Sequence, residues 1–442
     1  MTRRAWSMLL FAAGSLVVPA TGQGQDTGSV PVVSLPEARR RAQAVDADAV
    51  AARGQVSTTA WEQRVARIDL LTPRLSGDVN YTHFSDPFFN FGTGNISPNA
   101  ASATLQASYT VLGAGKLAEL RRARAALASA EASETAVRFG TALETDAAYF
   151  AVLADRELAR VAADRLRRAE EQFGVARVRV LAGEAIAPDS LQLLLEVSRA
   201  RFVVLQRDSA LTTSRLRLGR RVGLAGAADA APIDTTAPPP LPLSRSDAIT
   251  ELRARGPTLE AARAAERSAS AVLAAEREGY LPDVTVGATT GAYDQELFPS
   301  ALRRSQFAVT LSLPIWNGGQ RELAVARAGA ARTVARARRE EEERAAGEVM
   351  AAAYDGYETA RAGITLATVA VAAAAENYRV QRARYREGAT TILDLIEAQL
   401  ALSEAEASVI QARYTTRLRL AQIEALLGRR IHDGSDTDPT DR

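Results

Sequence analysis

Residues 183–189 read GEAIAPD and residues 388–394 read GATTILD, and these two stretches decide the architecture of the chain. Each begins with glycine and ends with aspartate, and 205 residues separate them. Other pairs match at the same offset: Phe173 and Tyr378, Arg177 and Arg382, Arg179 and Arg384, Leu195 and Leu400, Ser198 and Ser403, Ala200 and Ala405, Gly223 and Gly428. Upstream the offset drifts by a few residues, as short insertions would cause, so that Gly115 matches Gly319. The sequence therefore predicts one unit of about 190 residues that is present twice.

The boundaries of the two units follow from helix-start and helix-stop signals. The first unit spans residues 34–223 and the second spans residues 244–428, with a proline-rich linker at 224–243 and a polar tail at 429–442. Ser34 with Glu37, and Ser244 with Asp247, are typical of a capping box that begins a helix. One continuous helix is expected from each serine to the next proline, Pro73 or Pro282. A strand hairpin, a long helix and a return helix are expected to follow in each unit.

Composition excludes several functional classes. A net charge of +2, with arginine and glutamate alternating along helical stretches, predicts solvated helix faces and no nucleic-acid partner. The chain has no cysteine, which excludes disulfides and a thiolate nucleophile. Its two histidines are His83, in a predicted strand, and His432, in the polar tail. We therefore predict no catalytic residues, no metal site and no cofactor, and the protein is not expected to be an enzyme.

The first residues predict export. Arg3 and Arg4 precede an apolar run from Met8 to Val18, and small residues follow near Ala20 and Gly22. This pattern is typical of a secretory signal peptide, assigned to residues 1–22. No later segment has the 18 or more apolar residues of a membrane helix. If the mature chain enters a membrane, strands must carry it there.

Two hairpins, at about 74–112 and 283–315, alternate between apolar and polar side chains. Four segments of roughly nine to eleven residues with a period of two are typical of membrane-spanning strands. The alternative is a pair of amphipathic hairpins packed on a soluble core. Export and flanking aromatic residues favour the membrane, and the segments Ser85–Ala101 and Glu296–Arg304 are expected to be loops. Four strands cannot close a barrel, and lipid does not tolerate an open sheet edge, so several chains must combine their strands.

The helices that follow the hairpins are too long for a globular core. No proline interrupts the patterns from Lys116 to Leu181 and from Gln320 to Arg386, which predict helices of roughly 100 Å. Shorter helices return over Pro188–Val222 and Thr391–Leu427. The last helix carries two apolar seams, starting at Leu395 and at Leu393, and two seams indicate neighbours on both sides. Helices arranged side by side as the wall of a tube satisfy this pattern, and a central helix of a bundle is the competing interpretation.

Residues 34 to about 428 resemble the TolC-like outer membrane efflux proteins (outer membrane factors). The most specific stretch is YREGATTILDLIEAQ at 385–399, which is similar to the family's turn between two tunnel helices. The second is LPIWNGG at 313–319, which resembles the family's step from strand to helix, and TVLGAG at 110–115 and VLAG at 180–183 are weaker copies. The resemblance implies a homotrimer with a mixed α and β fold. Four strands per chain form a twelve-stranded barrel in contact with outer-membrane lipid, which continues into a long periplasmic α-helical barrel.

The resemblance also assigns roles at the helical tip. Asp394 and Glu397 match the acidic residues that form the periplasmic constriction, although helix capping alone would explain Asp394. Asp189 and Tyr385 match latch positions, but Thr390 stands where some members carry an arginine partner for that aspartate. The turns at Gly183 and Gly388 match the sites that meet the periplasmic adaptor.

The function implied is an exit duct in the cell outer membrane with a periplasmic extension. It would serve a tripartite efflux pump or a type I secretion system as a passive conduit. Its partners would be a periplasmic adaptor (membrane fusion) protein and an inner-membrane transporter. The alternative is a soluble periplasmic coiled-coil scaffold or adaptor, and the distribution of apolar residues over the hairpins discriminates between the two.

Overall fold

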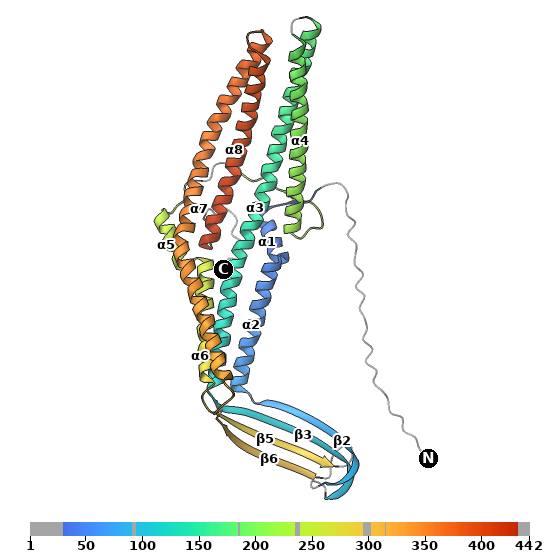
Figure 1. The fold of residues 1–442 in the computed structure, drawn as a ribbon, viewed down its shortest axis with the longest axis vertical. Coiled ribbons are helices and arrows are strands. Elements are labelled where there is room, and N and C mark those ends of the chain that lie inside the picture. Colours follow the sequence, from blue (N-terminus) through green and yellow to red (C-terminus); the bar gives the residue numbers. More distant parts are fainter. Residues whose placement is uncertain are drawn as a thin grey trace, which may run out of the picture.

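The computed structural model describes residues 30–90, 94–183, 186–234, 239–294, 302–313 and 315–431. The predicted signal peptide, residues 432–442 of the predicted tail, Pro314 and most of the predicted loop Glu296–Arg304 lie outside these ranges. The molecule is elongated, with a sheet at one end and two helical hairpins at the other (Figure 1). The elements are, in order, β1 (Val32–Val33), α1 (Leu35–Val45), α2 (Ala47–Leu71), β2 (Arg74–Asn90), β3 (Asn95–Gly113), α3 (Ala114–Leu181), α4 (Ala187–Arg221), β4 (Asp229–Ala230), α5 (Arg245–Arg255), α6 (Pro257–Glu278), β5 (Asp283–Asp294), β6 (Leu302–Ser312), α7 (Gln320–Arg386) and α8 (Ile392–Leu427).

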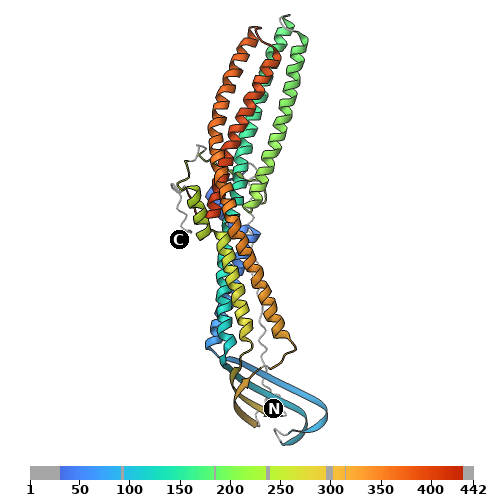
Figure 2. The same ribbon diagram turned by 60° about the vertical axis from the view of Figure 1, so that its left-hand side comes forward.

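Two unbroken helices run most of the length of the molecule. Helix α3 has 68 residues and α7 has 67, so each extends about 100 Å. The first and last residues of both helices agree with the predicted ranges to within two residues. Helix α3 packs against α2 in its first half and α4 in its second, and α7 packs likewise against α6 and α8 (Figures 1 and 2). Because α3 also packs against α6 and α8, the upper helices lie side by side in the order α4, α3, α8, α7.

The first helix of each unit is broken, which corrects the prediction of one continuous helix. Helix α1 ends at Asp46, whose side chain accepts hydrogen bonds from the N–H groups of Asp48 (3.1 Å) and Ala49 (3.2 Å) and so begins α2. In the second unit the break falls at Gly256, because Pro257 occupies the first position of α6, where proline is tolerated.

The two predicted capping boxes at the unit starts have different outcomes. Ser244 accepts a hydrogen bond from the Asp247 N–H (3.2 Å), as a cap requires. Ser34 makes no side-chain cap bond, so that prediction is wrong. The Glu37 carboxylate is instead bound by Arg40 and Arg41 on the next turn of its own helix, which removes it from the cap.

The segment predicted as a linker carries a short strand. Strand β4 pairs in parallel with β1, so that Val32 lies opposite Asp229 and Val33 opposite Ala230. A fully buried tyrosine on each long helix binds this part of the chain. The Tyr149 hydroxyl donates to the Ala231 carbonyl (2.8 Å), and the Tyr357 hydroxyl donates to the Pro239 carbonyl (2.8 Å).

The hairpins join into one antiparallel sheet in the order β2, β3, β5, β6. Strands β2 and β3 have 17 and 19 residues and extend through most of the segment Ser85–Ala101, so the prediction of a loop there is wrong. The pairing of β2 with β3 shifts between His83 and Phe88, and Pro87 falls in this irregularity, as expected for proline in a sheet. Strands β5 and β6, of 12 and 11 residues, are close to the predicted length.

The register confirms that the apolar positions of all four strands share one face. Leu75 lies opposite Ala107, Ala107 opposite Ala288, and Ala288 opposite Phe307. The row one residue away is polar throughout and lies on the other face; it consists of Ser76, Gln106, Thr289 and Gln306. Many large side chains of the apolar face are exposed in the chain: Leu75, Val79, Leu105, Phe307, Val309 and Leu311.

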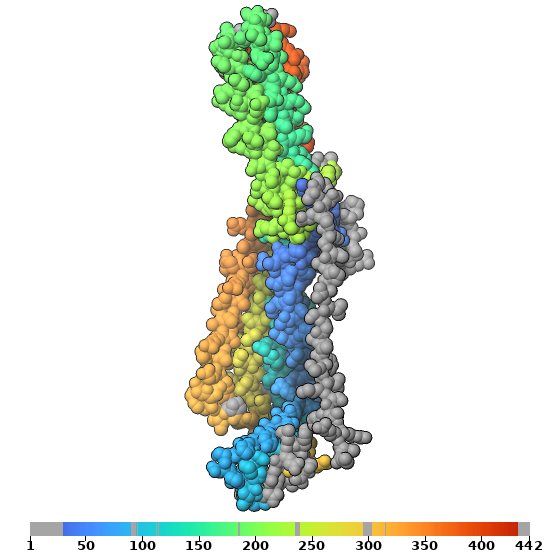
Figure 3. Space-filling view, turned by 90° about the vertical axis from the view of Figure 1, so that its right-hand side faces the viewer, coloured from blue at the N-terminus to red at the C-terminus, as the bar shows by residue number. Residues whose placement is uncertain are grey.

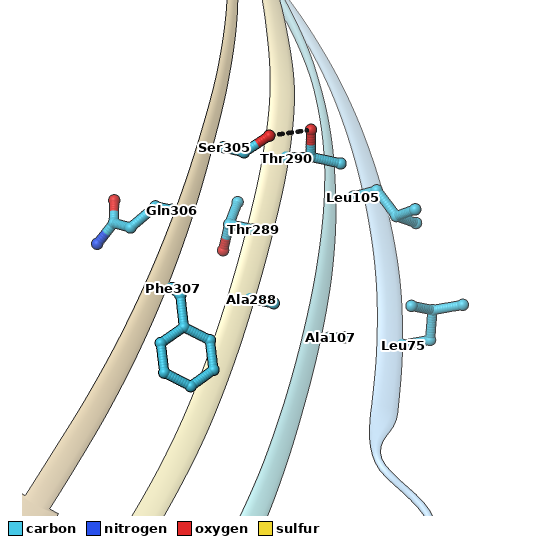
Figure 4. Close-up of a pocket in the computed structure, with 9 residues that line it drawn as sticks. All are labelled: Leu75, Leu105, Ala107, Ala288, Thr289, Thr290, Ser305, Gln306 and Phe307. Atoms are coloured by element: carbon cyan, nitrogen blue, oxygen red, sulfur yellow. Dashed lines mark hydrogen bonds between the residues drawn. The ribbon is translucent and has the colours of Figure 1, made fainter.

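A hollow of about 530 Å³ lies on this sheet, and Figure 4 shows the residues that line it. Seven of its nine lining residues belong to the apolar face: Leu75, Leu105, Ala107, Ala288, Thr290, Ser305 and Phe307. The hydroxyls of Thr290 and Ser305 share a hydrogen bond of 3.0 Å. In the described residues, no helix is apolar enough over sufficient length to cross a bilayer.

Candidate functional site: the helical tip

Two tight turns form the end of the molecule opposite the sheet (Figure 1). Gly183 lies two residues after the end of α3 and has a φ of 77°. Gly388 lies two residues after the end of α7 and has a φ of 75°. A side chain at Gly183 would meet nothing within 4 Å, so its positive φ, which other residues rarely adopt, is the reason for glycine there. The predicted docking turns therefore lie together at one end.

Asp394 lies in the first turn of α8 and forms a complete capping box with Thr391, as predicted. One carboxylate oxygen, Oδ2, accepts from the Thr391 hydroxyl (2.6 Å), the Thr391 N–H (3.0 Å) and the Thr390 hydroxyl (2.8 Å). The Thr391 hydroxyl bond, followed by the Thr390 hydroxyl bond, lowers the pKa of Asp394 below its usual value. The side chain is nevertheless exposed, so capping leaves its charge accessible to solvent.

Glu397 lies one turn further along α8 and is also exposed. Three residues of spacing place it on the same helix face as Asp394. The opposite face packs against α3 and α7 through Leu395, Ala398 and Leu402. The two carboxylates therefore project together from one side of the layer of helices.

The predicted latch residues come close to each other, but a third residue makes the contact. Tyr385 is buried, and within the described part of the chain its hydroxyl makes no hydrogen bond. Burial, and then the charge of Asp189, raise the pKa of Tyr385. Arg179 donates from Nη1 to the Tyr385 carbonyl (2.9 Å), and its guanidinium carbon lies 5.6 Å from the centroid of the tyrosine ring.

Sequence reasoning missed this role of Arg179, although its match with Arg384 at the repeat offset marked the position. Thr390 does not bind Asp189, since its hydroxyl donates to Asp394. Among the described residues of the tip, Arg179 thus makes a polar contact between the α3–α4 hairpin and the α7–α8 hairpin.

Below the tip, polar contacts join the two hairpins. The Gln172 amide donates to the Tyr378 hydroxyl (2.8 Å), and Arg168 binds Glu406 (3.1 Å). The Gln399 amide donates to a backbone carbonyl of α3 (3.1 Å). The seam within one chain therefore combines these polar contacts with apolar packing of α8, which includes Leu395 and Leu402. Among the residues described, no group of three or more His, Cys, Asp or Glu side chains could hold a metal ion.

Comparison with known proteins identifies the family. The family model described as outer membrane efflux protein matches residues 59–224 and 248–429. The outer membrane protein OprJ of Pseudomonas aeruginosa is 27% identical over 311 residues, which is 68% of this chain and 64% of that protein. The chain thus aligns with less than two thirds of the length of that relative.

Solved structures share the fold. The CmeC outer membrane channel of Campylobacter jejuni superimposes with a TM-score of 0.77 at 15% identity, covering 94% of this chain and 92% of that one. The open-state MtrE outer membrane channel of Neisseria gonorrhoeae gives 0.73 at 20% identity, covering 91% of each chain. The chain belongs to the family of outer membrane efflux proteins, as the resemblance of its turn and strand-to-helix motifs predicted.

Proposed function

We propose that the protein is a passive exit duct of the outer membrane, through which a periplasmic adaptor and an inner-membrane transporter export their cargo. The observation that carries this proposal is the sheet, whose four strands present one continuous exposed apolar face and a polar opposite face. A hairpin of a soluble scaffold would have to cover such a face against protein. Membership of the outer membrane efflux family supports the membrane as its partner.

The barrel would form by pairing between chains. In the described sheet β2 and β6 are the outer strands, and each has one edge without a partner. Lipid cannot satisfy the free N–H and C=O groups of such edges, so they must pair with other strands. Pairing β6 of one chain with β2 of the next closes a ring, and three chains supply twelve strands.

The helices offer a matching interface between copies. Helices α4 and α7 lie at opposite ends of the helical layer, and each has an exposed apolar face. The face of α4 includes Leu191, Phe202 and Leu205, and that of α7 includes Leu366, Val369 and Val380. Figure 3 looks onto the first of these faces, where α4 (green) lies at the surface above α2 (blue). A contact between two different faces of identical chains builds a ring when its rotation closes.

The heights of the two faces agree. Leu205 lies 18 residues after the start of α4, and Val369 lies 17 residues before the end of α7. At a rise of about 1.5 Å per residue, both are about 26 Å from the tip. The ring would surround a tunnel, with Asp394 and Glu397 from each chain at its narrow end and the turns at Gly183 and Gly388 presented to the adaptor.

Cysteine cross-linking tests this arrangement, because the chain has no cysteine of its own. In membranes from cells that express Leu205→Cys with Val369→Cys, oxidation should give covalent dimers and trimers. Leu205→Cys with Val349→Cys is the matched control: Val349 is also exposed on α7 but lies about 30 Å further from the tip. Detergent extraction and mass measurement should then show three chains. Recovery of a soluble monomer, or equal cross-linking of both pairs, would contradict the proposal.

A further inference from the structure

Arg199 and Glu404 occupy matched positions of the two units and carry opposite charges. At the repeat offset, Ser198-Arg199-Ala200 corresponds to Ser403-Glu404-Ala405, so that a cation and an anion stand between identical neighbours. The charge also reverses between Arg201 and Glu406 and between Asp208 and Arg413, so the contacts of each pair must show which charges the fold of one chain explains.

The two sites are equivalent in local structure. The Ser198 hydroxyl donates to the Leu194 carbonyl (3.0 Å), and the Ser403 hydroxyl donates to the Gln399 carbonyl (3.0 Å), in each case one turn earlier in the same helix. Because the flanking serines are oriented alike, the residue that follows each serine also leaves its helix in an equivalent direction.

Both charges are left to solvent although their neighbours are paired. Arg199 and Glu404 are exposed, and neither forms an ion pair within the described part of the chain. Two residues further on, by contrast, Arg201 binds Glu170 (2.8 Å) and Glu406 is bound by Arg168 (3.1 Å). The helix seams of one chain therefore do not account for the charges at these two positions.

Glu404 continues the stripe that begins with the acidic pair of the tip. It lies seven residues, or two turns, after Glu397, and both share the exposed face of α8 with Asp394 and Gln411. Seven residues correspond to about 10 Å along the helix. Arg199 takes the matched position on α4, seven residues after Gln192.

We infer that Arg199 and Glu404 form a second ring in the tunnel, in which three cations alternate with three anions, and that this ring confines the cation preference of the acidic tip. The inference rests on the proposed function, because the ring exists only in a closed trimer. The two rings are separated by about one screening length at physiological salt. A cargo would therefore pass from the ring of Asp394 and Glu397, which is acidic only, to a ring that presents both positive and negative side chains.

Reversal potentials of reconstituted single channels in a salt gradient test the inference. Arg199→Gln should leave only glutamates in the second ring and shift the reversal potential toward greater cation selectivity. Glu404→Gln should leave only arginines and shift it the opposite way, while the double variant should return close to the parent. Arg201→Gln is the matched control, since that arginine is paired with Glu170 and should change selectivity little.

Thiol labelling gives a second readout that does not depend on selectivity. A cysteine at position 199 or 404 should react with charged methanethiosulfonate reagents and reduce the conductance of the open channel, whereas a cysteine at position 205 should not. A channel in which Asp394→Asn with Glu397→Gln changes selectivity, but variants at 199 and 404 change neither selectivity nor labelling, would overturn the inference alone. If no trimeric channel forms from the parent chain, the proposed function fails as well.

Discussion

At the scale of single residues, the carboxylate of Asp394 caps α8 and is also exposed. Its Oδ2 atom accepts all three of its short hydrogen bonds, from Thr390 and Thr391. These bonds favour the ionised form, and the exposed side chain keeps its charge accessible to solvent. The capping role therefore supports the proposed role in the constriction, because the cap holds the charge in place and in its ionised state.

The lowered pKa predicts how cation selectivity responds to acid. In a Glu397→Gln background, cation selectivity should persist as the pH falls through 3.8, the ordinary pKa of aspartate. The reason is that the pKa of Asp394 is lowered, so its carboxylate loses its charge only at a more acidic pH. The same sign holds for stability: the contribution of Asp394 is present above the unfolded-state pKa and is lost as the pH falls through the folded-state pKa.

Thr390→Ala removes one bond to Asp394 but leaves the Thr391 cap, so in that background it should move the loss of selectivity to higher pH. Reversal potentials measured over a pH series give the midpoint. If Thr390→Ala leaves the midpoint in place, the bond from the Thr390 hydroxyl does not control the charge of Asp394.

The contact of Arg179 with Tyr385 leads to a prediction about single-channel conductance. Arg179→Gln should loosen the tip and raise the single-channel conductance, because a charged hydrogen bond contributes about 1.5–3 kcal/mol and an exposed cation–π contact about 0.5–1 kcal/mol. Arg177→Gln is the matched control, since that arginine is exposed and lies two residues earlier on α3. Equal conductance in both variants would show that Arg179 does not hold the hairpins together.

At the scale of elements, the faces of the sheet differ in what they tolerate. Val309 lies on the apolar face opposite Val286, and Thr310 lies on the polar face opposite Thr285. Val309→Arg should impair assembly in the outer membrane, because a charge facing the middle of a bilayer costs about 2–4 kcal/mol. Thr310→Arg, one residue away, should be tolerated. Heat-stable oligomers on gels report assembly, and equal tolerance of both variants would contradict the assigned orientation.

The sequence predicted the long helices and the strand faces well, because both depend on periodic patterns over many residues. The absence of proline between Gln320 and Arg386 and the strict alternation from Phe307 to Leu311 left little ambiguity. Prediction from the sequence failed where a single residue decides whether a helix ends. Pro257 after Gly256 was a visible break signal that a continuous apolar pattern concealed, and Asp46 ended α1 with a cap of its own.

Other features could not have been read from sequence spacing. Strands β1 and β4 have two residues each, and the whole first unit separates them in the sequence. The contact of Arg179 with Tyr385 joins residues 206 positions apart, so it depends on how the two hairpins pack. The resemblance to the family supplied the acidic pair and the latch positions. Because Thr390 stands where some members carry an arginine, the resemblance did not supply the contact between Arg179 and Tyr385, which only the structure revealed.

At the scale of the whole molecule, the two kinds of helix seam differ in character. The seam inside the chain buries apolar residues together with hydrogen bonds such as that between Gln172 and Tyr378, whereas large apolar residues on the outer faces of α4 and α7 are exposed in the single chain. Burial of apolar surface stabilises association by about 25 cal/mol per Å². Assembly of the proposed trimer would therefore depend mainly on the outer faces.

A charge on one outer face should separate the chains. Leu205→Glu should reduce the fraction of trimer recovered in detergent, because the carboxylate would be buried without a partner. Adding Val369→Arg should restore part of that fraction by pairing the charge across the interface. Asp208→Ala, which changes an exposed residue one turn further along α4, serves as the control. A trimer that is insensitive to Leu205→Glu would place the interface elsewhere.

The unpaired edges of β2 and β6 have a consequence for the synthesis and export of the protein. Outside the proposed trimer, a single chain exposes the outer edges of β2 and β6, an apolar sheet face and the apolar sides of α4 and α7. Open strand edges and large apolar patches are the surfaces through which proteins aggregate. The single chain is therefore prone to aggregate before it assembles. A cell that makes it faster than it can be inserted would accumulate insoluble or degraded protein rather than assembled protein.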